Sequence, residues 1–175
     1  TGGYRRTPAL QIGADIYCDT RLIAEILEAC HPEPTLFPGP DPARTRALSY
    51  GLATWAESQL LWPLALYITG IHADQFSVSF HADRARLHGK VAPNLSQIKK
   101  AAERNLPQVR SQLMWVDDLL KGKDNFVLGD SVSLADLTLY HPLFLLEIVG
   151  GRSEILDEFA LIRPWMERVA ALGHG

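Results

Sequence analysis

The stretch Gly129-Asp130-Ser131-Val132-Ser133-Leu134-Ala135-Asp136 (GDSVSLAD) specifies the start of a helix in more than one way. Ser133 is a favoured N-cap residue, and Asp136, three positions later, can accept a hydrogen bond from the Ser133 backbone N–H. Val132 before the cap and Leu137 after it have the spacing of a hydrophobic staple. The motif is a folding device, so it predicts a helix from about residue 134 without indicating any chemistry.

Helical periodicity extends from this motif in both directions. Apolar residues recur at spacings of three and four, which is typical of amphipathic helices. The predicted helix faces are Leu48, Leu52, Trp55, Trp62 and Leu66; Ile98, Ala102, Leu106, Val109, Leu113, Val116 and Leu120; Leu134, Leu137, Phe144, Leu145 and Ile148; and Phe159, Ile162, Trp165, Met166 and Val169. Pro63 should kink the first helix, and Pro107 should kink the second or mark a restart. Residues 71–94 are predicted as helix plus loop, within an all-α domain over residues 43–175.

The first 30 residues have a different pattern. Thr7–Ile12 and Ile16–Cys18 are short, apolar and partly β-branched, and Gly13-Ala14-Asp15 between them has the composition of a hairpin turn. Helical spacing follows over Thr20–Ala29. We therefore predict a ββα unit in residues 1–30. Because a two-stranded sheet is only marginally stable alone, we expect further structure to complete it.

A proline-rich linker separates the two units. Residues 31–42 (HPEPTLFPGPDP) contain five prolines and one glycine. Each proline fixes φ and removes a backbone donor, so this segment cannot be helical.

Composition and charge restrict the classes of function. The 175 residues carry 17 Lys and Arg against 20 Asp and Glu, a net charge of −3, and no basic run exceeds a pair. This argues against a surface for nucleic acid or anionic membrane. The most apolar stretch, Leu143–Val149, is interrupted by Glu147 and is far shorter than the roughly 20 residues that span a bilayer. Cys18 and Cys30 make no disulfide framework, so we expect a cytoplasmic protein.

The order of these units resembles the soluble, bacterial-type glutathione S-transferase family over nearly the whole chain. The resemblance rests on the ββα unit ending in Ile16-Tyr17-Cys18-Asp19-Thr20, the linker, the helical domain and residues 129–136; Arg163–Val169 is similar to the family's closing core helix. It implies an α/β thioredoxin-like N-terminal domain, with only its ββα half present and its first βαβ unit absent, followed by an all-α helical bundle. It also implies a homodimer.

The resemblance further implies a glutathione site. Thr7-Pro8 resembles the family's cis-proline stretch, so we expect a cis bond that lets Thr7 pair with the cysteinyl backbone of glutathione. Asp19-Thr20 stands where the family usually has Glu-Ser; Thr20 would hold the γ-glutamyl carboxylate at the helix N-terminus, and Asp19 the ammonium. The alternatives are an ordinary edge-strand proline and an ordinary N-cap.

The implied activity is attack of the glutathione thiolate on a hydrophobic electrophile, or a related glutathione-dependent reduction or isomerisation. In the family the Tyr, Ser or Cys that stabilises the thiolate belongs to the first βαβ unit, so the catalytic residue is not expected here. Tyr4, Tyr17 and Cys18 are better explained by packing. The alternative is a noncatalytic binding or assembly protein with the same fold.

Trp55, Ser58 and Trp62 lie within two turns of the helix that lines the family's electrophile pocket, and the resemblance makes them candidate substrate contacts. An aromatic stripe at helical spacing is, alternatively, part of a core.

The remaining candidate site residues are two His-x-Asp patterns and one histidine at a predicted proline bend. His72-Ala73-Asp74 and His81-Ala82-Asp83 lack a helix-spaced His pair or a nearby Cys, so we predict no metal site. Tyr140-His141-Pro142 is predicted to be a histidine packed at a proline bend, with the cleft as the alternative.

Overall fold

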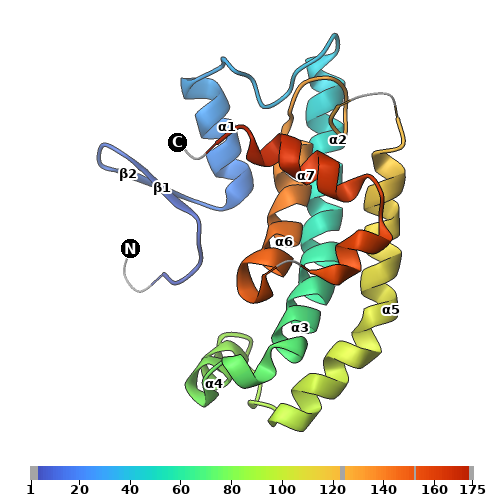
Figure 1. The fold of residues 1–175 in the computed structure, drawn as a ribbon. Helices are drawn as coiled ribbons and strands as arrows, with labels where there is room; N and C mark the ends of the chain where they lie inside the picture. Colours follow the sequence, from blue (N-terminus) through green and yellow to red (C-terminus); the bar gives the residue numbers. More distant parts are fainter. Residues whose placement is uncertain (1–3, 123–124, 152, 174–175) are drawn as a thin grey trace.

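The N-terminal unit is a β-hairpin followed by a helix. The computed structural model describes residues 4–122, 125–151 and 153–173 (Figure 1). Strands β1 (Ala9–Ile12) and β2 (Asp15–Cys18) are antiparallel, with Ala9 opposite Cys18. Helix α1 (Thr20–Cys30) follows directly. The predicted ββα unit is confirmed, and the turn uses Gly13 at a φ of 59°.

Beyond the linker the described chain is mainly helical, as predicted. Its elements are α2 (Pro42–Trp55), the π-helix η1 (Ala56–Leu61), α3 (Trp62–Ile71), the 3₁₀ helix η2 (Ala73–Gln75), α4 (Val78–Leu87), α5 (Leu95–Leu119), α6 (Leu134–Gly150), the 3₁₀ helix η3 (Glu154–Glu158) and α7 (Ile162–Ala170). In the described part of the chain no helix has both the length and the apolar character needed to cross a membrane.

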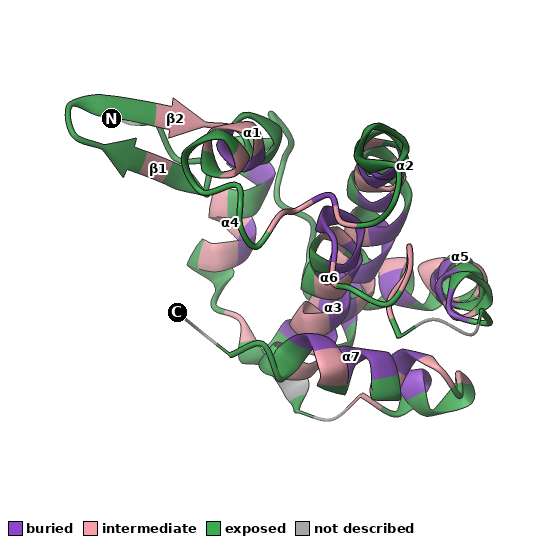
Figure 2. Ribbon diagram, turned by 90° about the horizontal axis from the view of Figure 1, so that it is seen from above, coloured by how far each residue is buried: buried purple, intermediate pink, exposed green. Residues whose placement is uncertain are grey.

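The main core lies where α3, α5, α6 and α7 face one another (Figure 2). Its fully buried members include Leu64, Leu113, Leu143 and Trp165. The predicted face of α5 is confirmed, because Ile98, Ala102, Val109, Leu113, Val116 and Leu120 are buried and Leu106 packs against the core. Helix α5 continues through Pro107, so this proline does not mark a restart.

The apolar stripe predicted for the first long helix is not its core face. Leu48, Trp62 and Leu66 are exposed, whereas Ala56, Leu60, Leu64 and Ile68 are buried. This segment is apolar on more than one side, so the period alone does not select the buried face. The π-helix immediately before Trp62-Pro63 also shifts the register of later residues.

The predicted face of α6 is partly wrong for the same reason. Leu134 is buried, but Leu137 and Ile148 are exposed. The buried positions are instead Leu139, Leu143 and Leu146. Because α6 is almost entirely apolar, its own sequence pattern does not determine which side is buried. That side is determined by packing against the neighbouring helices.

The predicted capping box at the start of α6 is confirmed. Asp136 Oδ2 accepts hydrogen bonds from the Ser133 backbone N–H at 2.9 Å and the Ser133 hydroxyl at 2.8 Å. Asp136 Oδ1 also accepts the Val127 N–H and the Trp165 indole N–H, both at 2.9 Å. The completely buried carboxylate therefore joins three parts of the helical domain.

A second, smaller core attaches α1 to the helical body. Phe37 of the linker is buried with Ala24 of α1 and Leu134 of α6. The Leu134 backbone N–H donates to the Leu36 carbonyl at 2.9 Å, and Glu28 accepts the Leu36 N–H at 2.8 Å. The linker is thus an ordered part of the fold and fixes where α1 lies.

Candidate functional site

The four residues predicted to hold glutathione lie at one end of the hairpin. Ala9 pairs with Cys18 in the antiparallel register. Thr7-Pro8 directly precedes this pair and Asp19-Thr20 directly follows it, so hairpin geometry brings both dipeptides to the same end. The Thr7–Pro8 peptide bond is cis, as expected. All four residues are exposed.

Asp19 has an unusual backbone conformation. It is the N-cap of α1 and has a φ of 85°, the one positive φ among the described non-glycine residues. Its Oδ1 accepts the Arg21 backbone N–H at 2.9 Å, and its carbonyl accepts the Ile23 N–H at 3.0 Å. A non-glycine residue at positive φ is strained by about 1–3 kcal/mol, and such residues concentrate at functional sites. The sequence carried no signal for this strain.

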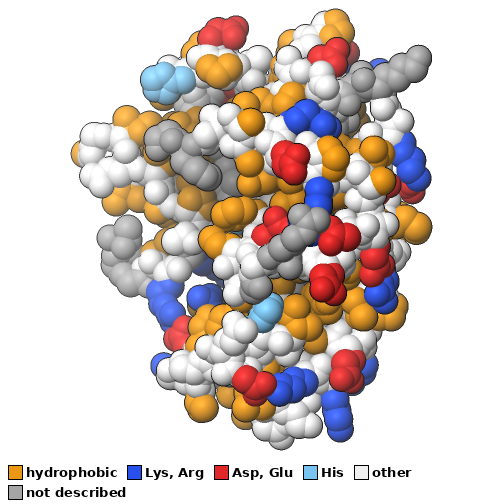
Figure 3. Space-filling view, in the orientation of Figure 1, with side chains coloured by type: hydrophobic (Ala, Val, Ile, Leu, Met, Phe, Trp, Pro, Cys, Tyr) orange, Lys and Arg blue, Asp and Glu red, His pale blue; other side chains and the backbone are white. Residues whose placement is uncertain are grey.

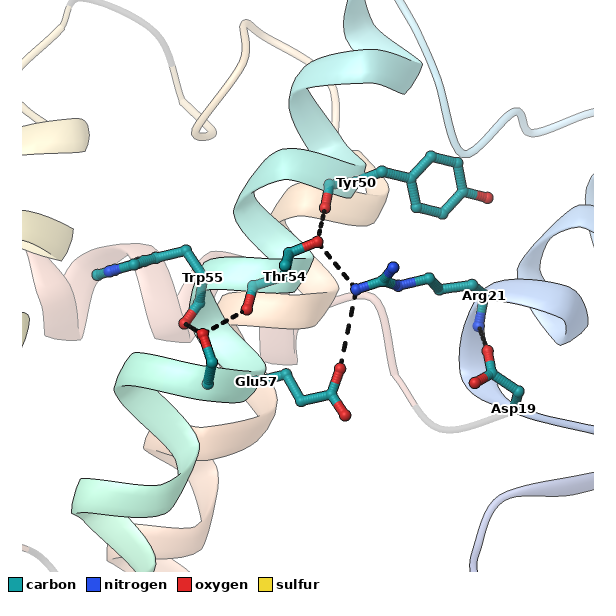
Figure 4. A network of polar contacts seen from close by, with 7 residues as sticks. Asp19, Arg21, Tyr50, Thr54, Trp55 and Glu57 are labelled. Atoms are coloured by element: carbon teal, nitrogen blue, oxygen red, sulfur yellow. Dashed lines mark hydrogen bonds and ion pairs between the residues drawn. The ribbon is translucent and has the colours of Figure 1, made fainter.

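Arg21 connects this end of α1 to the helical body (Figure 4). Its Nη2 donates to Thr54 Oγ1 at 2.9 Å and lies 3.8 Å from Glu57 Oε2. Thr54 in turn donates to the Tyr50 carbonyl at 2.8 Å. Sequence reasoning missed this bridge, because no short-range pattern relates residues 33 positions apart.

A second bridge lies further along α1. The Tyr50 hydroxyl donates to Glu25 Oε1 at 2.5 Å, and Arg46 binds the other oxygen of Glu25 at 2.7 Å. Burial and the bond to Glu25 raise the pKa of Tyr50 to about 12. The Arg46 guanidinium also lies 4.5 Å from the centre of the Phe37 ring. Together the two bridges hold α1 against α2.

The three predicted substrate contacts do not meet in one pocket. Trp55 stacks on Trp115 of α5, with ring centres 6.1 Å apart. Ser58 donates to the Thr54 carbonyl of its own helix at 2.8 Å. Trp62 is exposed, and its ring and the His88 ring are nearly perpendicular, with centres 5.0 Å apart.

Trp55 lines a cavity of about 400 Å³ with apolar walls. Its lining residues are Leu52, Trp55, Trp115, Asp118 and Leu119, and neither Ser58 nor Trp62 is among them. Sequence reasoning missed Trp115, although a tryptophan outside the apolar face of an amphipathic helix was a usable signal.

The aspartates of the two His-x-Asp patterns form ion pairs with two different basic residues. Asp74 pairs with Lys99 at 2.6 Å, and Asp83 pairs with Arg5 at 2.8 Å. His81 is buried, with Nε2 3.3 Å from the Ala73 carbonyl. Among residues 4–122, 125–151 and 153–173, no group of three His, Cys, Asp or Glu residues could hold a metal ion.

The proline bend in α6 differs from its prediction. His141 is exposed instead of packed, and α6 runs through Pro142 without a break. Tyr140 stacks on Phe144 and lines a second cavity of about 340 Å³ between α6 and α7. Tyr4 is exposed, and Tyr17 and Cys18 are half-buried in the hairpin.

Comparison with known proteins points to one family. The family model described as glutathione S-transferase, C-terminal domain, matches residues 99–168. A GST-like protein from Pseudomonas syringae is 28% identical, with a TM-score of 0.65, over 99% of this chain and 51% of that one. A glutathione S-transferase from Rhodospirillum rubrum is 21% identical, with a TM-score of 0.63, over 95% of this chain and 66% of that one.

A third structure, glutathione S-transferase-I bound with lactoylglutathione, is 19% identical, with a TM-score of 0.64, over 94% of this chain and 69% of that one. The chain thus spans about half the length of the first of these structures and about two thirds of the other two. No curated protein sequence matches it.

Proposed function

We propose that the chain is a member of the glutathione S-transferase family, because residues 99–168 match the family's C-terminal domain and the likeness to a GST-like structure covers 99% of the chain. We propose further that it binds glutathione at the Thr7-Pro8 and Asp19-Thr20 end of the hairpin. The fold is the ββα part of a thioredoxin-like domain followed by an all-α domain. The proposed reaction is transfer of the glutathione thiolate to a hydrophobic electrophile, or a related glutathione-dependent reaction. The observation that carries the proposal is the strand register, which gathers the two dipeptides.

Thr7 is proposed to bind the cysteinyl part of glutathione through its backbone. The β1–β2 ladder begins at Ala9, so Thr7 lies outside it. A peptide ligand can then pair with Thr7 as an added strand would. Pro8 has no backbone N–H, and its ring fixes φ, which restricts the backbone conformation of this segment.

The start of α1 is proposed to hold the γ-glutamyl end. Thr20 is the first residue of an eleven-residue helix, where the helix dipole favours an anion by about 0.3–1 kcal/mol. The Thr20 hydroxyl would donate to the γ-glutamyl carboxylate. Asp19 uses Oδ1 for the Arg21 N–H, so Oδ2 would accept from the ligand's ammonium group.

A thiol with a pKa of about 8.5 is mostly protonated at neutral pH, so the reaction needs a group that stabilises the thiolate. In the family this group belongs to the first βαβ unit. The proposed contribution of the described residues is therefore to bind and orient glutathione. Of the three candidate substrate contacts we retain Trp62, whose ring is exposed, because we assign the cavity at Trp55 to the dimer interface proposed below and because Ser58 is bonded within its helix.

We further propose a homodimer that buries the exposed apolar side of α2 and α5. Trp115 and Leu119 line the cavity beside Trp55 and are exposed, and the exposed Leu48 lies one helical turn before Leu52, another lining residue. Contiguous apolar patches on a protein surface commonly mark interfaces. We propose the cytoplasm as its location, where Cys18 and Cys30, which are free in the structure, would stay reduced.

The proposal is tested by calorimetric titration of the full chain with glutathione. Asp19→Asn should weaken binding about tenfold, because an amide keeps the N-cap but loses the charge that attracts the ammonium group. Asp41→Asn is the matched control, since Asp41 caps α2 through the Arg44 N–H at 3.1 Å. Conjugation of 1-chloro-2,4-dinitrobenzene is then measured. Binding without turnover would favour the noncatalytic alternative, and absence of binding would reject the proposal.

A further inference from the structure

The cavity of about 340 Å³ between α6 and α7 is not used by the proposed function. Its lining residues recur every three or four positions along each helix, so each helix presents one face to it. They include Tyr140, Phe144 and Ile148 of α6 and Arg163, Glu167 and Ala170 of α7. The residues that line it include none from the hairpin, α1 or α2. Its volume is within the range typical of small-molecule sites.

The α6 side of this cavity is aromatic. Tyr140 stacks on Phe144, with ring centres 5.6 Å apart and ring planes at 20° to each other. Both side chains are half-buried, and Ile148, one turn after Phe144, is exposed. The face of an aromatic ring is apolar and carries partial negative charge, so it can contact both the hydrocarbon part of a ligand and a cation.

The charged lining residues of the cavity are two acids, Glu147 and Glu167, and one base, Arg163. Each of the three guanidinium nitrogens of Arg163 already donates a hydrogen bond. Nη1 donates to Glu147 Oε1, and Nε donates to Asp157 Oδ1 at 2.5 Å. Nη2 donates to the Ser153 carbonyl at 2.6 Å. Arg163 is therefore committed to the protein, and the cavity does not favour an anionic ligand.

The second acid, Glu167, is available to a ligand. It is exposed and forms no ion pair with any residue that the structure describes. Both helices also end beside the cavity, because Ala170 is the last residue of α7 and Ile148 lies two residues before the end of α6. Helix C-termini carry partial negative charge, so they add to the preference for a cation.

The surface around the cavity is acidic as well. Residues 147–167 contain five Asp and Glu residues and two Arg residues. Figure 3 shows several Asp and Glu side chains in the region where α7 and the chain leading to it lie in Figure 1. A surface of this charge raises the local concentration of cations at low ionic strength.

We propose that the cavity between α6 and α7 binds an arylalkyl ammonium ligand, whose ring lies against Tyr140 and Phe144 and whose ammonium group pairs with Glu167. The aromatic side chains supply the apolar contact, and the free carboxylate and the two helix ends supply the preference for positive charge. This site shares no residue with the proposed glutathione site, so it does not depend on the proposed function.

The test compares 2-phenylethylammonium with 2-phenylethanol, which has nearly the same shape and no charge, by NMR chemical-shift titration of the full chain. We expect the ammonium probe to bind about fivefold more tightly at low salt, because an exposed ion pair and a helix end each contribute modestly. The preference should shrink as salt is added. A third probe, 3-phenylpropanoate, should bind more weakly than the alcohol. Equal affinities for the ammonium probe and the alcohol, or tighter binding of the carboxylate, would overturn the proposal.

Two substitutions locate the ligand. Glu167→Gln should reduce the preference for the ammonium probe to about twofold or less. Glu103→Gln is the matched control, because Glu103 is an exposed acid on α5 that does not line the cavity, and it should leave the preference unchanged. Phe144→Leu keeps an apolar side chain but removes the aromatic face, so it should weaken both probes. A preference that persists in Glu167→Gln, or affinities unchanged in Phe144→Leu, would reject this cavity as the site.

Discussion

The indole N–H of Trp165 donates a 2.9 Å hydrogen bond to Oδ1 of Asp136, and both side chains are completely buried. The same carboxylate also binds the backbone of Val127 and both the backbone and hydroxyl of Ser133. One charged group thus holds α7, the start of α6 and the segment before it. Several hydrogen bonds offset the cost of burying a charged group. Removing that group leaves the buried donors without an acceptor.

Asp136→Ala should therefore lower the free energy of unfolding by about 3–5 kcal/mol in urea denaturation, because several donors lose their acceptor at about 1–3 kcal/mol for each one that stays buried. Asp130→Ala is the control, because Asp130 is exposed and, among the residues that the structure describes, accepts one 3.3 Å bond, from Asn125. Its effect should stay within about 0.5 kcal/mol. Similar losses for the two variants would contradict the network.

Only part of this network could be predicted. The bond from Ser133 to Asp136 is local, so the GDSVSLAD pattern indicates it. The Trp165 donor is 29 positions away and reaches Asp136 only through tertiary packing. The same distinction applies to the helices. The face of α5 could be predicted because its other sides are mostly polar, whereas α3 and α6 are apolar nearly all round and leave the buried side to their neighbours.

Gly70 is required by the contact between α3 and α5. A Cβ at Gly70 would clash with the Ala102 Cβ and would lie 2.9 Å from the Ile98 carbonyl oxygen. Gly70→Ala should destabilise the protein by about 1–3 kcal/mol, as overpacking does. Gly51→Ala in α2 has open space around its new Cβ and should instead stabilise by about 0.5–1 kcal/mol. Thermal unfolding of both variants checks the pair, and a stabilising Gly70→Ala would refute the close packing.

The raised pKa of Tyr50 should make the free energy of unfolding fall at high pH. Its pKa rises from 10.0 to about 12 in the folded protein, so between these values the folded state holds a proton that the unfolded state has lost. Stability from this group is complete below about pH 10 and is lost as the pH rises towards 12. Tyr50→Phe should remove this part of the pH dependence. Tyr67→Phe serves as the control. Urea denaturation between pH 9 and about pH 12 measures the free energy of unfolding of both variants and the original protein. If this free energy changes with pH in the same way in the original protein and in Tyr50→Phe, Tyr50 does not cause the effect.

Arg21 should matter more for the site than for stability. Its bond to Thr54 is exposed, so Arg21→Ala should lower the free energy of unfolding by about 1 kcal/mol at most. The variant frees the start of α1 from α2, and glutathione affinity should fall because Asp19 and Thr20 are then less well positioned. Thr54→Val removes the same bond without touching α1 and should reproduce most of the loss, since only the 3.8 Å contact with Glu57 remains. A glutathione affinity unchanged in both variants would show that the bridge does not position the site.

The part of the candidate site that depends on residues close together in the sequence could be predicted. Thr7-Pro8 and Asp19-Thr20 each stand next to a strand whose partner follows from the short turn at Gly13, so hairpin register alone brings them together. Arg21 and Thr54 meet only because the linker fixes α1 against α2, through Phe37 in the small core. No periodicity in either helix encodes that placement.

Trp115 provides the test of the proposed dimer. It is half-exposed, stacks on Trp55 and lines the cavity between α2 and α5. Trp115→Glu places a charge where the interface would exclude water, so it should convert the dimer into a monomer of 19.4 kDa in light scattering. Val91→Glu is the control, because Val91 is 93% exposed in the loop before α5 and should leave the mass unchanged. If the original protein is already a monomer, or if Trp115→Glu remains dimeric, this face is not the interface.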